Sequence, residues 1–168
     1  MAWVQRRQNC ETSTVIEFDY QLTGQGWSAA WIADDTGSAR LSASYLSDAL
    51  RHLLEAVALS VEGVPESRCS WDEEPGEYRW ILRRSGEQVV VTILWFDDLW
   101  SGLADQRGRP VFETTQDAQA LGTAVEGGAR RLLDELGPQE YERQWFEHPF
   151  PLDALDRLHT AITGPDTV

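Results

Sequence analysis

The fold of this chain is decided by residues 77–96, EYRWILRRSGEQVVVTILWF, which predict two antiparallel strands. In residues 77–84, aromatic and leucine side chains face one side and mostly arginines face the other, the period-two pattern of a half-buried strand. Ser85-Gly86 has the chemistry of a tight hairpin turn. Residues 87–96 are apolar on both faces, so we expect this strand to lie in the middle of a sheet.

Other elements flank this hairpin on both sides. Before it, the pattern predicts three strands, a helix with Ser47 as its N-cap and a fourth strand, at residues 14–22, 27–33, 39–45, 46–61 and 68–71. Pro75-Gly76 predicts a type II turn. After the hairpin, residues 111–113 predict either a short strand or a loop. Three helices come next: a long one that opens at Thr115 or Asp117, and two at residues 138–146 and 152–162.

The resulting order, βββαβββαα, is typical of an α+β fold. Sequential strands pair with their neighbours, so we expect one antiparallel sheet of about six strands with the helices packed on one face. No linker or internal boundary stands out, and 168 residues suit one domain. We therefore expect a single α+β domain over residues 1–168, with residues 1–13 and 163–168 as frayed termini.

The charge of the chain limits its partners. There are 14 basic residues, all arginine, against 28 acidic ones, which gives a formal net charge of −14. This charge repels nucleic acids and anionic membranes. It would steer a basic partner protein inward, or it serves solubility alone. Eight tryptophans and 42% hydrophobic residues exclude a disordered acidic tail.

The compartment is inferred from features that the sequence lacks. No apolar segment comes after the charged start, so we expect no secretory signal, and the apolar stretch at residues 46–61 carries too many charges to span a membrane. Cys10 and Cys69 then predict two reduced thiols, although Arg68 is placed to lower the pKa of Cys69. We expect a cytoplasmic protein.

Acidic and aromatic residues gather around the turn at residues 71–80. One interpretation is a binding surface for a basic partner, with Trp71, Glu74, Glu77 and Arg79 as its residues. The other interpretation is structural: the acids are solvated and the aromatic residues belong to the core. The turn lacks the alternating ligands of a calcium loop, so no metal site is predicted.

A second candidate lies where residues 87–96 end. Asp97, Asp98 and Trp100 lead into a long loop over residues 101–109, and loops of this length are often functional. Adjacent aspartates on an extended chain point to opposite sides and need not converge. Trp100 would be an interface residue if exposed and would pin the loop if buried; we favour the pin. No residue has the pattern of a catalytic group, and no cofactor is predicted.

Three segments carry a resemblance to known proteins, namely residues 46–50, 69–82 and 145–152. On these, the chain resembles an uncharacterised family of small acidic actinobacterial proteins. Its size, acidity and element order are also similar to those of immunity proteins of bacterial toxin systems. That likeness implies a non-catalytic protein that neutralises a basic toxin.

Three hypotheses are consistent with these features. The favoured one is a non-enzymatic acidic interaction protein, immunity-like in character. The second is a small-ligand-binding protein or enzyme with a cleft lined by Glu74, Asp97, Asp98 and Arg79. The third is a homodimer that uses a sheet face or the C-terminal helices.

Overall fold

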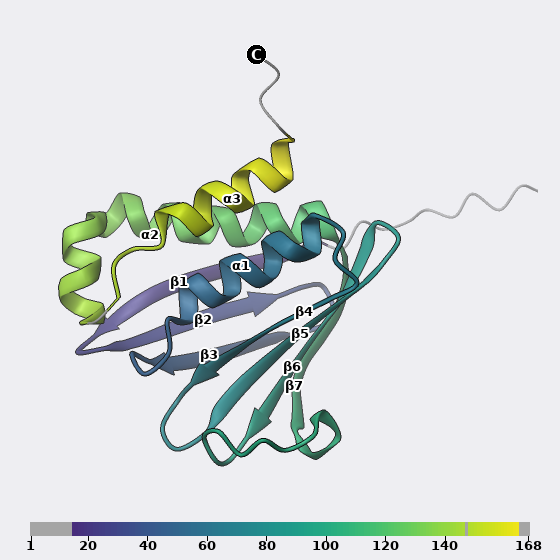
Figure 1. Ribbon diagram of the computed structural model, residues 1–168, viewed down its shortest axis with the longest axis horizontal. Coiled ribbons are helices and arrows are strands. Elements are labelled where there is room, and N and C mark those ends of the chain that lie inside the picture. The colour runs from purple at the N-terminus through teal and green to yellow at the C-terminus, as the bar shows by residue number, and fades with distance from the viewer. Residues whose placement is uncertain (1–14, 147, 165–168) are drawn as a thin grey trace, which may run out of the picture.

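The computed structural model describes residues 15–146 and 148–164, and Figure 1 shows their arrangement. The strands are β1 (Glu17–Gly24), β2 (Trp27–Ala33), β3 (Ser38–Ser44), β4 (Glu66–Asp72), β5 (Glu77–Ser85), β6 (Gln88–Phe96) and β7 (Arg109–Asp117). The helices are α1 (Ala49–Val61), α2 (Ala118–Trp145) and α3 (Leu152–Thr163), with a short 3₁₀ turn, η1 (Asp105–Arg107). The α+β class and most of the expected element order are confirmed.

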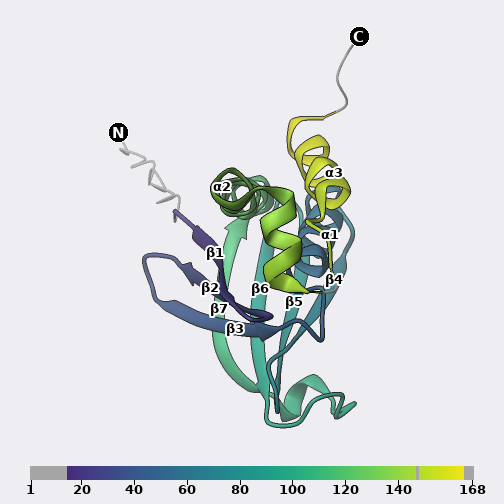
Figure 2. The same ribbon diagram turned by 90° about the vertical axis from the view of Figure 1, so that its left-hand side faces the viewer.

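The strands form two antiparallel sheets, so the prediction of one six-stranded sheet is wrong. The first sheet has the order β1-β2-β3, and the second has the order β4-β5-β6-β7. The chain enters α1 between β3 and β4, and those two strands are not paired with each other. In Figures 1 and 2 the three helices gather above the sheets, at one side of the molecule.

Strand β7 is the seventh strand, where the sequence predicts only a short strand or a loop. It pairs with β6 from Asp117 opposite Gln88 to Arg109 opposite Trp95. Its inward residues are Phe112, Thr114 and Gln116, and two of these three are polar. Hydrophobic alternation therefore fails to mark the strand. With β5 and β7 on either side, β6 is central, as its apolar faces predict.

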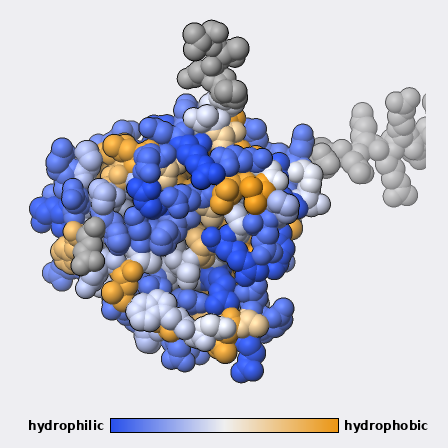
Figure 3. Space-filling model, in the orientation of Figure 1, coloured by the Kyte–Doolittle hydropathy of each residue, from blue (hydrophilic) through white to orange (hydrophobic). Residues whose placement is uncertain are grey.

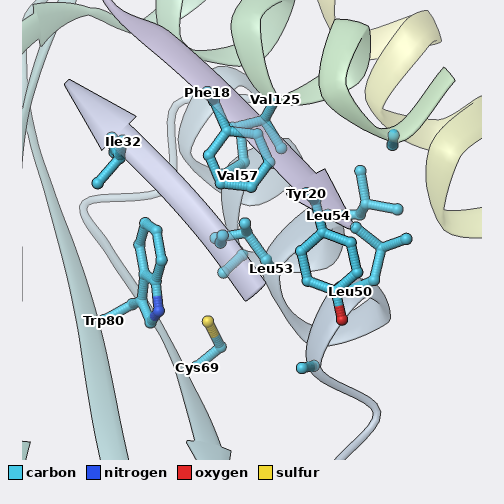
Figure 4. Packing of buried hydrophobic residues seen from close by; sticks show 14 of the residues in the cluster. Phe18, Tyr20, Ile32, Leu50, Leu53, Leu54, Val57, Cys69, Trp80 and Val125 are labelled. Atoms are coloured by element: carbon cyan, nitrogen blue, oxygen red, sulfur yellow. The ribbon is translucent and has the colours of Figure 1, made fainter. Parts of the chain in front are cut away.

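One hydrophobic core joins both sheets and all three helices. Figure 4 shows Phe18 and Tyr20 of β1 and Ile32 of β2 beside the apolar residues of α1, with Trp80 of β5 close by. Leu50, Leu53, Leu54 and Val57 of α1 are buried, and Val61 at its end is partly buried. Because α1 is covered on several sides, it is the element around which the core is built.

The start of α1 differs from the prediction. The residue at the N-cap is Asp48, whose side chain makes no capping hydrogen bond. The predicted cap, Ser47, instead accepts a hydrogen bond from the backbone N–H of Asp72, with 3.0 Å between the nitrogen and Oγ. Ser47 thus ties the start of α1 to the end of β4.

Two further boundaries bear on the predictions. The side chain of Asp117 caps α2 by accepting a hydrogen bond from the backbone N–H of Ala120. The sequence predicts that this helix begins at Thr115 or Asp117, and the second is confirmed. Gly137 takes a positive φ of 72° and interrupts α2 where the sequence predicts a break before Pro138. The type II turn at Pro75-Gly76 is not formed, because Gly76 does not have the positive φ that the second central residue of such a turn requires.

Candidate functional site

A groove of about 620 Å³ runs between α1 and strand β4. We call it the acidic groove. Its carboxylates are Asp48, Glu55, Asp72 and Glu77; its other charged or titratable residues are His52, Arg68 and His148; its remaining lining is Leu46, Ser47, Ala56, Leu59, Cys69, Ser70 and Trp100. Figure 3 shows that hydrophilic residues cover most of this side of the molecule, with apolar residues exposed in separate small patches.

Asp72 is the residue that sets the groove apart. It ends β4 and is only 5% exposed, yet within the described residues no arginine or histidine lies within ion-pair distance of its carboxylate. Burial raises the pKa of Asp72; the indole of Trp100 and His52 oppose this rise, and the nearby carboxylates of Glu77 and Glu74 add to it. A buried charge without a counter-ion is costly, so the ionised form of Asp72 lowers the stability of the fold.

The other two buried carboxylates of the groove already have partners. Glu77 accepts from Arg79 Nη2 at 2.7 Å and from Ser70 Oγ at 3.0 Å. Asp48 Oδ2 lies 3.2 Å from Arg51 Nε and 3.8 Å from His148 Nδ1. Both groups raise the negative potential of the groove while their positions are held by the protein itself.

Trp100 stands beside Asp72 and is 73% exposed. Its backbone has a φ of 50°, a conformation that residues with a side chain seldom adopt. The turn at Pro75 helps to hold it, since the backbone N–H of Leu99 donates to the Pro75 carbonyl at 2.7 Å. The prediction that Trp100 is buried and pins its loop is therefore wrong; the side chain is exposed, and its role as an interface residue stays a prediction.

The loop after β6 is pinned by Asp105 instead. Its carboxylate accepts from Arg68 and Arg79, with N–O distances of 2.8 and 3.0 Å, and Arg83 lies 3.8 Å away. Burial opposes ionisation of Asp105, but the hydrogen bonds from Arg79 and Arg68 outweigh it and lower the pKa of this carboxyl. This network joins arginines of β4 and β5 to η1, and it fixes the loop that carries Trp100.

Trp71 belongs to the core. Its side chain has no exposed surface and packs edge-on against Tyr20 and beside Trp80, with ring centroids 5.8 and 5.1 Å apart. It points inward because β4 alternates, so that Ser67, Cys69 and Trp71 face α1. Trp71 is therefore removed from the candidate interface. The structural interpretation of its segment is confirmed for the tryptophans but is wrong for Asp72 and Glu77, which are buried and not solvated.

The remaining predicted residues are only partly brought together. Glu77 and Trp100 line the acidic groove, and Arg79 supports it from outside, with its guanidinium 4.1 Å from the ring centre of Phe96. Glu74, Asp97 and Asp98 are exposed and do not line it; Asp97 accepts from the indole Nε1 of Trp95 at 2.8 Å.

The sequence reasoning missed Asp72 as a site residue. Strand alternation places it on the same face as Arg68 and Ser70 and opposite Trp71, which is the signal that was present. Alternation does not predict which distant residues lie near Asp72, because the proximity of α1 and of Trp100 results from tertiary packing alone.

Several other kinds of site find no support in the described part of the chain. Residues 15–146 and 148–164 contain no cluster of three or more His, Cys, Asp or Glu side chains suited to a metal ion. Their helices include none with the length and apolarity needed to cross a membrane. Burial raises the pKa of the Cys69 thiol far above its ordinary value, so the expected lowering by Arg68 is wrong. Cys10 lies outside the described residues.

Comparison of the chain with protein-family models, curated proteins and solved structures gives no match. A function for this protein therefore has to be inferred from the geometry and charge of the acidic groove.

Proposed function

We propose that this chain is a non-enzymatic interaction protein that binds a basic partner protein through the acidic groove. The single observation that carries the proposal is the buried carboxylate of Asp72, which lacks a cationic partner in the described structure and lies beside the exposed Trp100. An arginine or lysine side chain of the partner would supply the missing counter-ion.

The chemistry of the pair suits a guanidinium group best. Its planar fork can donate two hydrogen bonds to a carboxylate while its face stacks on an aromatic ring. Glu77, Asp48 and Glu55 surround this position with negative charge, and the net charge of −14 favours the approach of a basic surface. The exposed indole then shields the new ion pair from water, as aromatic residues do at binding hot spots.

This site favours binding over catalysis. The cleft expected for an enzyme combines Glu74, Asp97 and Asp98, and these exposed carboxylates do not line the groove. We propose an immunity-like role, the neutralisation of a basic toxin, as the specific form of the function, because such a partner would present the basic surface that this groove fits.

The proposal is tested with a short basic peptide, acetyl-TVRVRVT-amide, by isothermal titration calorimetry. We expect the wild-type chain to bind this peptide and to show no binding of the acidic counterpart acetyl-TVEVEVT-amide. Asp72→Asn and Trp100→Ala should each weaken binding by about tenfold or more, since each removes one side of the proposed cation site. Asp72→Asn should leave the melting temperature unchanged or raise it, because it removes an unpaired buried charge.

The matched control is Asp98→Asn, which removes the same charge from an exposed position outside the groove. It should change the affinity by less than about threefold. Equal losses of peptide affinity in Asp72→Asn and Asp98→Asn, or no binding of the basic peptide at all, would contradict the proposed function.

A further inference from the structure

Strand β4 is an edge strand, and the acidic groove runs along its free side. Within the described residues β4 pairs with β5 alone. On its other side lie α1 and the groove, whose lining includes Arg68, Cys69 and Ser70. An edge strand presents a row of backbone donors and acceptors that another strand can use.

The hydrogen-bond pattern identifies the backbone groups of β4 that point into this space. The carbonyl of Pro65 accepts from the N–H of Arg84, and the N–H of Asp72 points away from β5, toward Ser47. In an antiparallel pair, residues that bond to the partner strand alternate with residues whose N–H and C=O point outward. Arg68 and Ser70 therefore direct their N–H and C=O groups to the free edge, and Asp72 continues the same row.

We propose that the basic partner segment is extended and adds to β4 as a further strand, pairing with Arg68 and Ser70 while one of its cationic side chains reaches Asp72. This inference rests on the proposed function for the charge of the partner and adds the backbone conformation in which the partner binds. Main-chain hydrogen bonds would supply affinity and the groove would select the side chains, as in other cases of strand addition.

Contacts at other strand edges make them less suitable. On β1, the guanidinium of Arg131 already donates to the carbonyl of Phe18 at 2.7 Å. On β7, the hydroxyl of Thr114 donates to the carboxylate of Asp34, in the turn between β2 and β3. On β3, the hydroxyl of Ser42 donates to Glu73 at 2.9 Å. The stretch of β4 around Ser70 combines an outward backbone with a groove and a carboxylate that lacks a counter-ion.

A second copy of this chain suits the edge poorly. Antiparallel pairing of two β4 strands about Cys69 would set Glu66 of one copy opposite Asp72 of the other. Like charges directly opposite each other are destabilising, and each copy brings a net charge of −14. The charge of the groove therefore points to a basic segment from another protein.

The experiment compares acetyl-TVRVRVT-amide with two N-methylated forms, one methylated at the valines and one at the arginines. Successive N–H groups of an added strand point to opposite edges, so only one of the two forms should lose its hydrogen bonds to β4. We expect that form to bind about tenfold or more weakly and the other form to keep most of the affinity. On binding, the amides of Arg68 and Ser70 should become protected from hydrogen exchange.

Variants of the chain give an independent readout. Ser70→Pro removes an outward N–H without removing a bond to β5, and proline is tolerated at strand edges. Ser70→Pro should lower the affinity for the peptide by about tenfold relative to Ser70→Ala, which loses the same hydroxyl but keeps the N–H.

Each outcome bears on a definite part of the binding mode. If both methylated peptides bind like the parent while Asp72→Asn still weakens binding, strand addition is overturned and the proposed cation site stands. If methylation matters on one edge but Asp72→Asn has no effect, strand addition stands and the cation site is overturned. If the chain instead sediments as a dimer whose β4 amides are protected without peptide, the edge belongs to a second copy and the inference fails.

Discussion

Replacing Trp71 with alanine should lower the free energy of unfolding by about 3–5 kcal/mol, the usual cost of truncating a fully buried tryptophan. Its ring lies between Tyr20 and Trp80 and has no exposed surface, so the substitution opens a cavity at the junction of the two sheets. For a chain of this length the melting temperature should fall by roughly 10 °C or more. Chemical denaturation followed by far-ultraviolet circular dichroism measures the first quantity, and thermal melting measures the second.

Trp100→Ala is the matched control, because it removes the same side chain from a position that is 73% exposed. Its free energy of unfolding should change by less than about 1 kcal/mol. If Trp100→Ala lowers the free energy of unfolding as much as Trp71→Ala does, the indole of Trp100 is part of the core, and its assignment to the groove is contradicted.

Gly76→Ala should also destabilise the protein, by about 1–3 kcal/mol. A Cβ atom at this position would overlap the ring of Trp95 and the backbone carbonyl oxygen of Phe96, and the carbonyl cannot turn aside as a flexible side chain can. The β4–β5 turn must then move away from β6, and Asp72 and Glu77 lie at the two ends of that turn. Peptide binding should therefore weaken together with stability, which thermal melting and calorimetry on the same variant can measure.

Gly37→Ala provides the comparison for this prediction. Gly37 lies in the turn between β2 and β3, where an added Cβ meets no atom within 4 Å. Its melting temperature should stay within about 2 °C of the wild type. Equal destabilisation at Gly37 and Gly76 would indicate that loss of backbone freedom, and not the overlap with Phe96 and Trp95, is the cause.

Much of the fold could be predicted, because local sequence patterns determine many of its elements. The hairpin of β5 and β6, the buried stripe of α1 and the break at Gly137 all result from periodicity and turn chemistry. The division into two sheets could not be predicted, because it depends on where α1 inserts and on which strands meet across it. The full length of β7 was not predicted, because its inward residues Thr114 and Gln116 are polar and the strand therefore lacks hydrophobic alternation.

The site was less predictable than the fold. The sequence left two interpretations of the β4–β5 turn, a binding surface or solvated acids beside core aromatic residues, because solvent exposure depends on tertiary packing. Trp71 and Trp100 have the same side chain and similar acidic neighbours in sequence, and packing buries the first and exposes the second. Asp72 became a candidate only when its burial and its lack of a counter-ion in the described structure were known.

The central claim is that the buried carboxylate of Asp72 receives a cation from the partner, and the pKa of Asp72 tests it most directly. Burial raises this pKa in the free protein, so ionised Asp72 costs stability at neutral pH, and that cost disappears as the pH falls below the pKa of the unfolded chain. A cation bound beside the carboxylate must lower the pKa, and binding must weaken on acidification through the pKa of the free protein.

The measurement is a pH titration of the Asp72 carboxyl carbon by nuclear magnetic resonance, with and without saturating acetyl-TVRVRVT-amide. We predict a pKa above that of an ordinary aspartate in the free protein and a clear fall when the peptide is bound. A pKa of Asp72 that is the same in the free and the peptide-saturated protein would contradict the central claim.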